Sequence, residues 1–460
     1  MYYVYVDDLV EYAQHSETVT GIQRVVVEMI KGMRSRFGGE NVRLIANRHS
    51  AKFCVYSSEL FTPDWTYHQE QFCRFFSVPS LAGQEFLIPI EEILAHKYSG
   101  LRYKFHKMRL KFRNLCTGGA TFRKFGATSK SAPPADCPNT LKARRFDLKF
   151  TRSDIVYVPG EFWNRPIERL CESFKDERTS PKLVLYLHDL IPIAAPEYTG
   201  PQLEKIYQHK LGVLLHHTIG VIANSQHTAS DLRKYIETCP YISNDMQIIV
   251  VPLAHEFIGD VDKLSFYERR SLSFITRLPY VLVVGTANAR KNAWATAYVW
   301  NMIRTTVGAS APRIIFVDHD VFLNEKFRSF MNVTGNIFGL AEIVRAPTDA
   351  QLAYLYKQCM FTIYPSLYEG WGLPVGESIW MEKMVISANT TSLPEVGGDF
   401  IDYFDHNDLG SFYNTCLKLV TDDAYRASRT ANLKHKPLRR WATVISETID
   451  AIEGIRSSTH

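Results

Sequence analysis

Short apolar runs alternate along the chain with segments in which apolar residues recur every three or four positions. The runs are typical of buried strands, and the periodic segments are typical of amphipathic helices. In the first half we expect strands at residues 2–6, 154–160, 183–190, 219–225 and 246–253. We expect helices there at residues 21–33 and 201–217, and a capped helix from Thr228, with a polar loop between the first strand and the first helix.

The second half of the chain repeats this alternation. We expect strands at residues 280–286, 313–318, 361–365 and 384–389, and helices at 291–303, 349–359, 373–383 and 439–455. Strands that alternate with helices form parallel sheets covered on both faces. The sequence therefore predicts an α/β fold with two Rossmann-like domains, residues 1–265 and 266–435, and a closing helix within 436–460. In such sheets ligands bind beyond the carboxyl ends of the strands.

Composition and charge narrow the class of protein. Apolar residues make up 46% and charged residues 22% of the chain, as in ordinary globular enzymes. The first ten residues carry two aspartates and no basic residue, unlike a secretory signal, and no apolar run is long enough to cross a bilayer. The eight cysteines are scattered without a CxxC pair, so we expect a reducing, cytoplasmic location without a zinc site or a disulfide framework.

The net charge of +5 is unevenly distributed. Residues 101–152 hold 14 basic and 2 acidic residues, whereas the rest of the chain is acidic on balance. We interpret residues 100–150 as a basic, partly disordered insertion in the first domain. Its segment RYKFHKMRLKFR (102–113) mixes arginine and lysine with aromatics, so it is either a solvated basic face or a peripheral contact with an anionic membrane. We do not expect nucleic acid as a partner.

The segment YPSLYEGWGLPVGE (364–377) follows an expected strand and begins a helix. Its glycines permit tight backbone, and Pro374 suits the first helical turn, so backbone N–H groups near Gly372 and Leu373 would form an anion site suited to a diphosphate. Glu369 and Glu377 flank that site and would accept hydrogen bonds from sugar hydroxyls. The alternative is that Glu377 is a helix-start charge and Glu369 an ordinary loop residue.

A second candidate, Gly285-Thr286 followed by Arg290-Lys291-Asn292, joins another strand to its helix. Two cations at a helix start oppose the helix dipole, which an anion between them would explain. Arg290 and Lys291 would then neutralise charge on a departing pyrophosphate. The alternative is an exposed basic turn.

Three weaker candidates also follow strands. His188 precedes Asp189 and would either contact a sugar or be a hydrogen-bonded core histidine. Gly21, in TGIQR, would let backbone approach a phosphate or a sugar. Asp318 and Asp320 have the Asp-x-Asp spacing of a metal site, but they lie apart from the better phosphate site, so we expect no metal and interpret them as a turn.

Together these segments resemble the family 4 glycosyltransferases, which have the GT-B fold of two Rossmann-like domains facing across a cleft. VGTANARKNAW (284–294) is similar to that family's phosphate loop, and residues 364–408 to its signature region with the Glu-x7-Glu spacing of Glu369 and Glu377. TVTGIQRVVVEMI (18–30) and VLYLHDLIPIAAPEY (184–198) resemble bacterial mannosyl- and rhamnosyltransferase-like members. Thr286 departs from the pattern, since some members have an arginine there.

The resemblance implies a retaining, metal-independent transfer from a nucleotide-diphosphate sugar, with no other cofactor. It implies that Lys291, Arg290, Gly372 and Leu373 bind the diphosphate and that Gly21 approaches it. Glu369 and His188 would contact the transferred sugar and Glu377 the ribose. Arg345, in Val344–Ala346, would lie near the base, with Thr286 beside the phosphates.

The resulting hypothesis is a hexosyltransferase of surface polysaccharide or lipopolysaccharide biosynthesis, acting on a glycan or lipid-linked acceptor, with GDP-mannose as the leading donor. We expect it in the cytoplasm, with peripheral contact at the inner face of the plasma membrane left open. The alternatives are a sugar-nucleotide epimerase or hydrolase of the same fold, and an inactive nucleotide-sugar-binding scaffold subunit.

Overall fold

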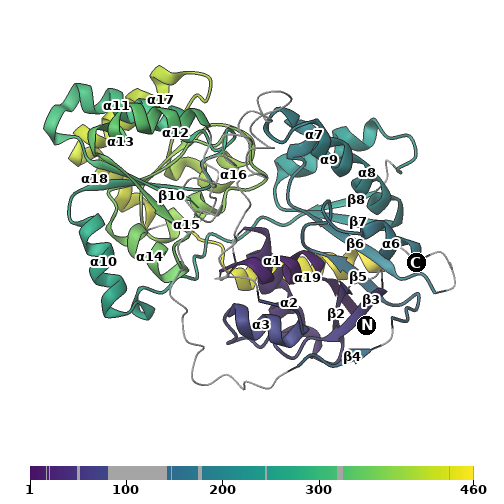
Figure 1. Cartoon of the computed structure of the whole chain (residues 1–460). Coiled ribbons are helices and arrows are strands. Elements are labelled where there is room, and N and C mark those ends of the chain that lie inside the picture. The colour runs from purple at the N-terminus through teal and green to yellow at the C-terminus, as the bar shows by residue number, and fades with distance from the viewer. Residues whose placement is uncertain are drawn as a thin grey trace, which may run out of the picture. The chain divides into compact units, whose positions relative to one another are not determined.

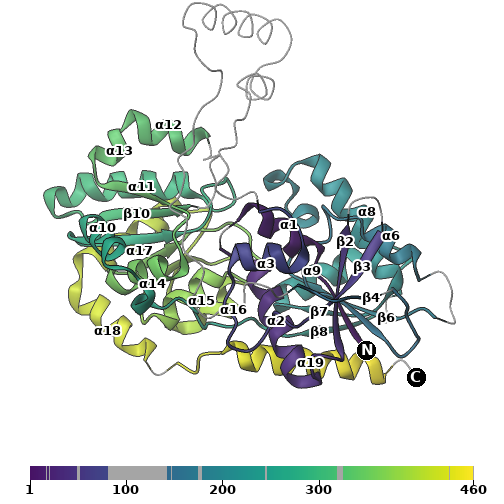
Figure 2. The same cartoon turned by 60° about the horizontal axis from the view of Figure 1, so that its bottom comes forward.

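The computed structural model describes residues 1–16, 18–19, 21–48, 52–80, 142–146, 148–174, 179–243, 246–318, 325–434 and 436–458. The chain divides into a larger unit, comprising Met1–Val10, Thr18–Thr66 and Ala143–His460, and a smaller one, comprising Glu11–Glu17 and Tyr67–Lys142. The larger unit contains two parallel-sheet α/β domains (Figures 1 and 2). The basic segment 102–113 and most of the expected insertion lie outside the described residues.

Among the described residues, the first sheet has eight strands in the order β4-β3-β2-β1-β5-β6-β7-β8. These are β4 (Arg145–Phe146), β3 (Lys52–Ser57), β2 (Val42–Arg48), β1 (Tyr2–Tyr5), β5 (Ile155–Val158), β6 (Lys182–Leu187), β7 (Thr218–Ala223) and β8 (Gln247–Val250). All pairs are parallel except those of β3, which is antiparallel to both β2 and β4. β1, β5 and β6 are buried almost completely, which explains their uninterrupted apolar sequences.

The helices of this half are α1 (Asp7–His15), α2 (Ile22–Phe37), α3 (Gln69–Phe76), α6 (Ile167–Glu172), α7 (Ile191–Ala194), α8 (Pro201–His217) and α9 (Gln226–Glu237). The polar loop expected after the first strand is wrong, because residues 7–15 form α1. Asp7 and Asp8 occupy its first turn, where acidic side chains favour the helix dipole. The helix expected from Thr228 begins earlier, at Gln226, because the Ser225 hydroxyl caps it by accepting from the Thr228 N–H.

The second sheet has the order β11-β10-β9-β12-β13-β14 in the described part of the chain, and its strand pairs are parallel. Its strands are β9 (Tyr280–Val284), β10 (Arg313–Asp318), β11 (Ala341–Arg345), β12 (Thr362–Tyr364), β13 (Val385–Ala388) and β14 (Asp402–Phe404). Its helices are α10 (Phe266–Thr276), α11 (Ala293–Val307), α12 (Glu325–Val333), α13 (Gly335–Phe338), α14 (Asp349–Gln358), α15 (Leu373–Trp380), α16 (Leu393–Gly397), α17 (Leu409–Thr421) and α18 (Asp423–Leu433). Short 3₁₀ turns lie at Pro196–Tyr198, Val261–Lys263, Gly308–Ser310 and Gly398–Phe400.

The closing helix, α19 (Trp441–Ser457), packs against α2 and β7 of the first domain, although it follows the second sheet in sequence (Figure 2). A side chain at Gly32 of α2 or at Gly220 of β7 would collide with Ile445 or Ile455 of α19. The two glycines therefore permit close packing of the helix. The predicted domain limits near residues 265 and 435 stay predictions.

The structure also bears on whether a helix of this chain could span a membrane. None of the described helices is both long enough and apolar enough to cross a bilayer.

Candidate functional site

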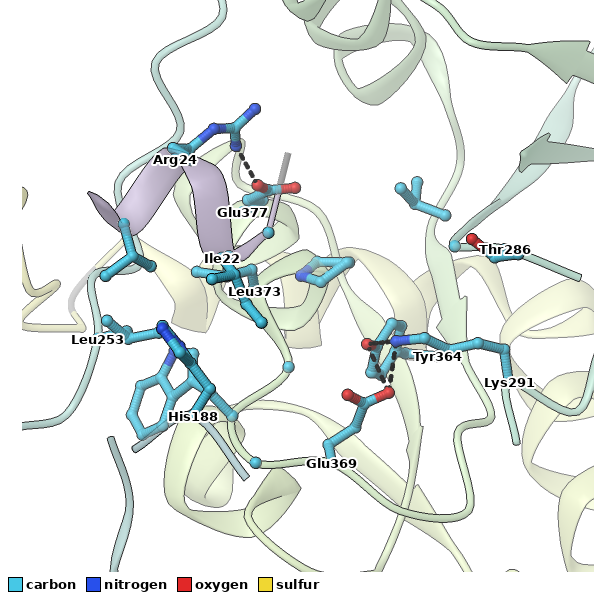
Figure 3. A pocket seen from close by; sticks show the side chains of 18 of the residues that line it. Ile22, Arg24, His188, Leu253, Thr286, Lys291, Tyr364, Glu369, Leu373 and Glu377 are labelled. Atoms are coloured by element: carbon cyan, nitrogen blue, oxygen red, sulfur yellow. Dashed lines mark hydrogen bonds and ion pairs between the residues drawn. The ribbon is translucent and has the colours of Figure 1, made fainter. Parts of the chain in front are cut away.

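A cavity of about 260 Å³ lies where strand ends of the first sheet meet strand ends and loops of the second (Figure 3). The first domain contributes the start of α2 and residues that follow β6 and β7, and the second contributes residues that follow β9 and β12. The predicted residues that line the cavity are Gly21, His188, Thr286, Lys291, Glu369, Gly372, Leu373 and Glu377. The structure therefore brings together residues from four separate segments of the sequence.

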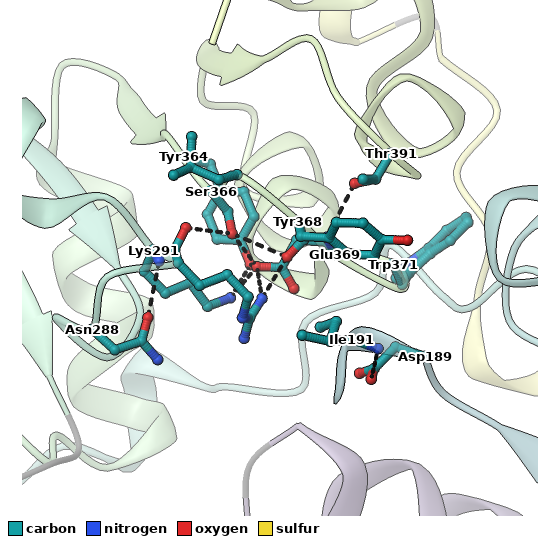
Figure 4. A network of polar contacts seen from close by, with 12 residues as sticks. Asp189, Ile191, Asn288, Lys291, Tyr364, Ser366, Tyr368, Glu369, Trp371 and Thr391 are labelled. Atoms are coloured by element: carbon teal, nitrogen blue, oxygen red, sulfur yellow. Dashed lines mark hydrogen bonds and ion pairs between the residues drawn. The ribbon is translucent and has the colours of Figure 1, made fainter. Parts of the chain in front are cut away.

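Glu369 accepts several hydrogen bonds and ion pairs on one oxygen, Oε1 (Figure 4). The Arg290 guanidinium lies 2.7 Å from it, and the Lys291 ammonium and the hydroxyls of Tyr364 and Ser366 also donate to it. Burial alone would raise the pKa of Glu369, but the two cations lower it to about 2. Glu369 is therefore ionised at neutral pH and shares its charge with both predicted phosphate-binding cations.

The pKa values of the two cations shift in opposite directions. Burial, helped by the neighbouring Arg290, lowers the pKa of Lys291 to about 8, although the charge of Glu369 acts in the opposite direction. For Arg290, the attraction of Glu369 outweighs burial and raises the pKa, so the guanidinium stays charged. The Arg290 side chain also donates to the Tyr368 carbonyl at 2.6 Å. Arg290 is thus a fixed charge beside the cavity, whereas Lys291 is a titratable one on its wall.

The helix α15 begins at the cavity wall with Gly372 as its N-cap. Gly372 has a φ of 106°, and no side chain caps the helix start, so its first-turn backbone is available to an anion. The preceding Gly370 packs directly against the segment that follows β6, because a Cβ there would lie 1.9 Å from the His188 carbonyl oxygen. This contact fixes the predicted anion site against the first domain.

His188 is a buried, hydrogen-bonded histidine that also lines the cavity, and its contact with a sugar stays a prediction. It is buried, and its Nε2 lies 2.6 Å from the Pro159 carbonyl, which can only accept, so Nε2 carries the proton. Burial lowers its pKa to about 4, so the ring is neutral near pH 7. With the proton on Nε2, the Nδ1 of His188 is a hydrogen-bond acceptor.

Arg24 is a cavity residue that the sequence analysis missed. From α2 it donates to Glu377 Oε1 at 2.8 Å (Figure 3). It also donates to Asp349 Oδ1 at 2.6 Å, while the Tyr356 hydroxyl donates to the other Glu377 oxygen at 3.0 Å. Burial raises the pKa of Glu377, and Arg24 opposes that shift. The available signal was an arginine inside an otherwise apolar helical stretch, IQRVVV. In the structure Glu377 therefore holds a cation from the first domain, at the position where a ribose was expected.

Two predicted features lie elsewhere. Arg345 is exposed at the end of β11 and is not among the cavity residues, although nearby Pro347 is. Asp318 ends β10 and is buried, whereas Asp320 lies outside the described residues. Within the described ranges, no group of three His, Cys, Asp or Glu side chains is placed to hold a metal ion. The metal-independent chemistry stays a prediction.

Similarity to solved structures identifies the fold. A sucrose-phosphate synthase from Thermosynechococcus elongatus matches over 99% of both chains with a TM-score of 0.58 and 12% identity. A trehalose-6-phosphate synthase from Burkholderia multivorans matches over 67% of this chain and 72% of its own, with a TM-score of 0.53 and 10% identity. The fold is GT-B. In a GT-B chain the cavity described above lies between the two domains, as the sequence predicted.

Sequence similarity connects this chain with mannosyltransferases. The serotype-specific mannosyltransferase WbdA of Escherichia coli is 27% identical over 69% of this chain, but the match covers 39% of WbdA. The O-antigen chain mannosyltransferase B of the same species is 25% identical over 55% of this chain and 73% of its own. No family model matches. The chain thus spans well under half the length of WbdA, so that protein's activity does not transfer directly.

Proposed function

We propose that this chain is a glycosyltransferase that moves a hexose from a nucleotide-diphosphate sugar to a glycan or lipid-linked glycan in surface polysaccharide synthesis. The main support for this proposal is that Lys291, Glu369 and the uncapped start of α15 all line the same cavity of a GT-B fold. Similarity to a serotype-specific mannosyltransferase and to an O-antigen chain mannosyltransferase supports mannose as the sugar, and we propose GDP-mannose as the donor. The cytoplasmic location stays a prediction.

The proposed roles follow from charge and position. The diphosphate would lie between the backbone at Gly372 and Leu373 and the cations Lys291 and Arg290. In the structure Glu369 supplies negative charge to these cations, and an incoming diphosphate would supply it in its place. When Arg290 and Lys291 pair with the phosphates instead of with Glu369, the Glu369 carboxylate would be available to accept hydrogen bonds from hydroxyls of the sugar. The neutral His188 would accept another hydroxyl hydrogen through Nδ1.

We propose that the transfer retains the anomeric configuration and needs no metal. Arg290 and Lys291 supply the positive charge that a metal ion would otherwise place on the leaving diphosphate. The C–O bond to the diphosphate breaks as the acceptor oxygen attacks from the same face of the sugar. The departing phosphate oxygen takes the acceptor's proton, so the step needs no further base.

The test is transfer of labelled mannose from GDP-mannose to a mannose-containing lipid-linked acceptor, with EDTA present and absent. Glu369→Gln keeps the side-chain size and removes the charge, so we expect kcat to fall on the order of a hundredfold or more. The matched control is Glu342→Gln, whose ion pair with Arg313 lies away from the cavity, and it should leave kcat unchanged. Near-normal turnover by Glu369→Gln would contradict the glycosyltransferase assignment. Strict dependence on a metal ion would contradict the proposed metal independence.

The same assay separates the alternatives. Consumption of GDP-mannose without a glycan product would favour the epimerase or hydrolase. Donor binding without any turnover would favour a scaffold subunit. A panel of nucleotide sugars in a thermal-shift assay would identify the donor, because a ligand of the folded state raises its unfolding temperature by mass action.

A further inference from the structure

The helix α10 exposes an unusual set of large apolar side chains. Phe266, Tyr267, Phe274 and the adjacent Leu278 are between 52% and 80% exposed. Phe266 and Phe274 stand two turns apart, and Tyr267 precedes Phe274 by seven residues, so these rings share one face. Leu272, on the opposite face, is buried in the core of the second domain. Exposed apolar clusters of this kind mark interaction sites.

The same face of α10 is basic. Arg270 and Arg277 are exposed and follow the helical spacing of Phe266 and Phe274. Neither guanidinium has an ion-pair partner among the described residues. The charges beside this face are already engaged: Glu268 bonds to Ser265 and Gln351, and Asp262 pairs with Arg269.

The combination of exposed apolar side chains and arginines that lack an ion-pair partner within the described ranges favours an anionic membrane surface as the binding partner. Aromatic and aliphatic side chains enter the headgroup boundary, and arginines beside them meet the anionic headgroups. A second copy of this chain would instead bring two like-charged arginine pairs together. In Figure 1, α10 lies at the outer edge of the second domain.

We propose that the α10 face, defined as Phe266, Tyr267, Arg270, Phe274, Arg277 and Leu278, binds the chain peripherally to anionic phospholipid membranes. This surface is separate from the basic segment 102–113 that the sequence suggested for such contact. It does not depend on the proposed transferase activity, because membrane binding needs neither donor nor acceptor. It would hold the enzyme where a lipid-linked acceptor lies.

The test is co-sedimentation of the full-length chain with vesicles of phosphatidylcholine alone or mixed with phosphatidylglycerol. We expect binding to the mixed vesicles that weakens as salt is raised. The triple variant Phe266→Ser, Tyr267→Ser, Phe274→Ser should lower the partition coefficient on the order of tenfold or more. Arg270→Gln with Arg277→Gln should lower it by about fivefold per arginine, and only on anionic vesicles.

The matched control is the pair Val333→Ser and Phe338→Ser, since these side chains are equally exposed but lie on α12 and α13. Vesicle binding should be unchanged in this control, and every variant should keep its unfolding temperature because only exposed side chains change. Unchanged binding by the triple variant would overturn the proposal and assign membrane contact to another part of the chain. Absence of binding by the wild type would also overturn it. So would a dimer that dissociates in the triple variant, because the face would then be a self-association surface.

Discussion

Arg24 Nη1 lies 2.8 Å from Glu377 Oε1, although 353 positions separate the two residues in sequence. Both side chains are buried, and Arg24 also pairs with Asp349. The cavity between the domains is therefore bridged by one cation and two carboxylates, and any ligand hydroxyl that reaches Glu377 competes with this bridge.

The first prediction concerns that bridge. Arg24→Met leaves two carboxylates without their cation, so we expect a loss of about 3–5 kcal/mol in the free energy of unfolding, measured by urea denaturation. The matched control is Arg144→Met, which breaks the largely exposed pair with Glu59 and should cost less than about 1 kcal/mol. Adding Glu377→Leu to Arg24→Met should restore part of the lost stability, because it removes a stranded charge. Equal losses at Arg24 and Arg144 would contradict the buried bridge.

The second prediction concerns the protonation of Lys291. Burial lowers its pKa to about 8, so the ammonium loses its proton as the pH rises through that value. A diphosphate needs the charged form, so donor affinity should be constant below about pH 7 and should fall by up to about tenfold per pH unit above about pH 8. Isothermal titration with the donor across this range measures the slope.

The matched variant for this pH dependence is Lys291→Arg. Its guanidinium stays charged throughout the range, so its donor affinity should be weaker from altered geometry but independent of pH. The same decline in both proteins would show that another group titrates, and Lys291 would lose its assigned role.

The parts of this fold that the sequence predicts are those with local signals. β6, β9 and β10 are uninterrupted apolar runs, and each is a buried parallel strand. The sequence did not predict β2, β3, β4, β11 and β14, which lie toward the edges of their sheets, or the short helix α1, which mixes acidic and apolar residues without a clear stop. Local pattern thus identifies the central strands and loses the periphery.

For the candidate site, the sequence identifies the loops but not their pairing. The glycines and Pro374 mark the start of α15 from local chemistry alone. The convergence of Arg290 and Lys291 on Glu369, nearly 80 positions away, depends on the pairing of β9 with β12 inside the second domain. The bridge from Arg24 to Glu377 depends on how the two domains meet. Such contacts have no local signal, since any buried carboxylate needs a partner and the sequence does not say which cation supplies it.

The third prediction tests Gly21 against a matched glycine. Gly21 and Gly200 both cap the start of a helix with positive φ, 53° and 85°, and a Cβ at either would meet no atom within 4 Å. Alanine should therefore cost similar stability at both, about 1 kcal/mol from backbone strain. Only Gly21 lines the cavity, so Gly21→Ala should also weaken donor binding by about 1–3 kcal/mol through steric conflict. Unchanged donor affinity in Gly21→Ala would remove Gly21 from the site.

The fourth prediction rests on three buried tryptophans. The indole N–H of Trp300 donates to the Pro312 carbonyl at 2.9 Å, and that of Trp441 to the Glu256 carbonyl at 3.1 Å. The N–H of Trp371, on the cavity wall, has no partner among the described residues. Replacement by phenylalanine should therefore cost about 1–2 kcal/mol less at Trp371, because no hydrogen bond is lost and an unpaired buried donor is removed. Chemical denaturation of the three variants measures this difference.

For donor binding we expect the opposite ranking, in which the replacement at Trp371 has the larger effect, because the unpaired N–H would bind the donor. A buried polar group without a partner requires an explanation, and a ligand oxygen in the cavity would supply one. Trp371→Phe should then weaken donor binding while Trp300→Phe leaves it unchanged, with both measured by titration at neutral pH. A Trp371→Phe protein that is as destabilised as Trp300→Phe, yet binds donor normally, would mean that the Trp371 N–H is satisfied by water and serves packing alone.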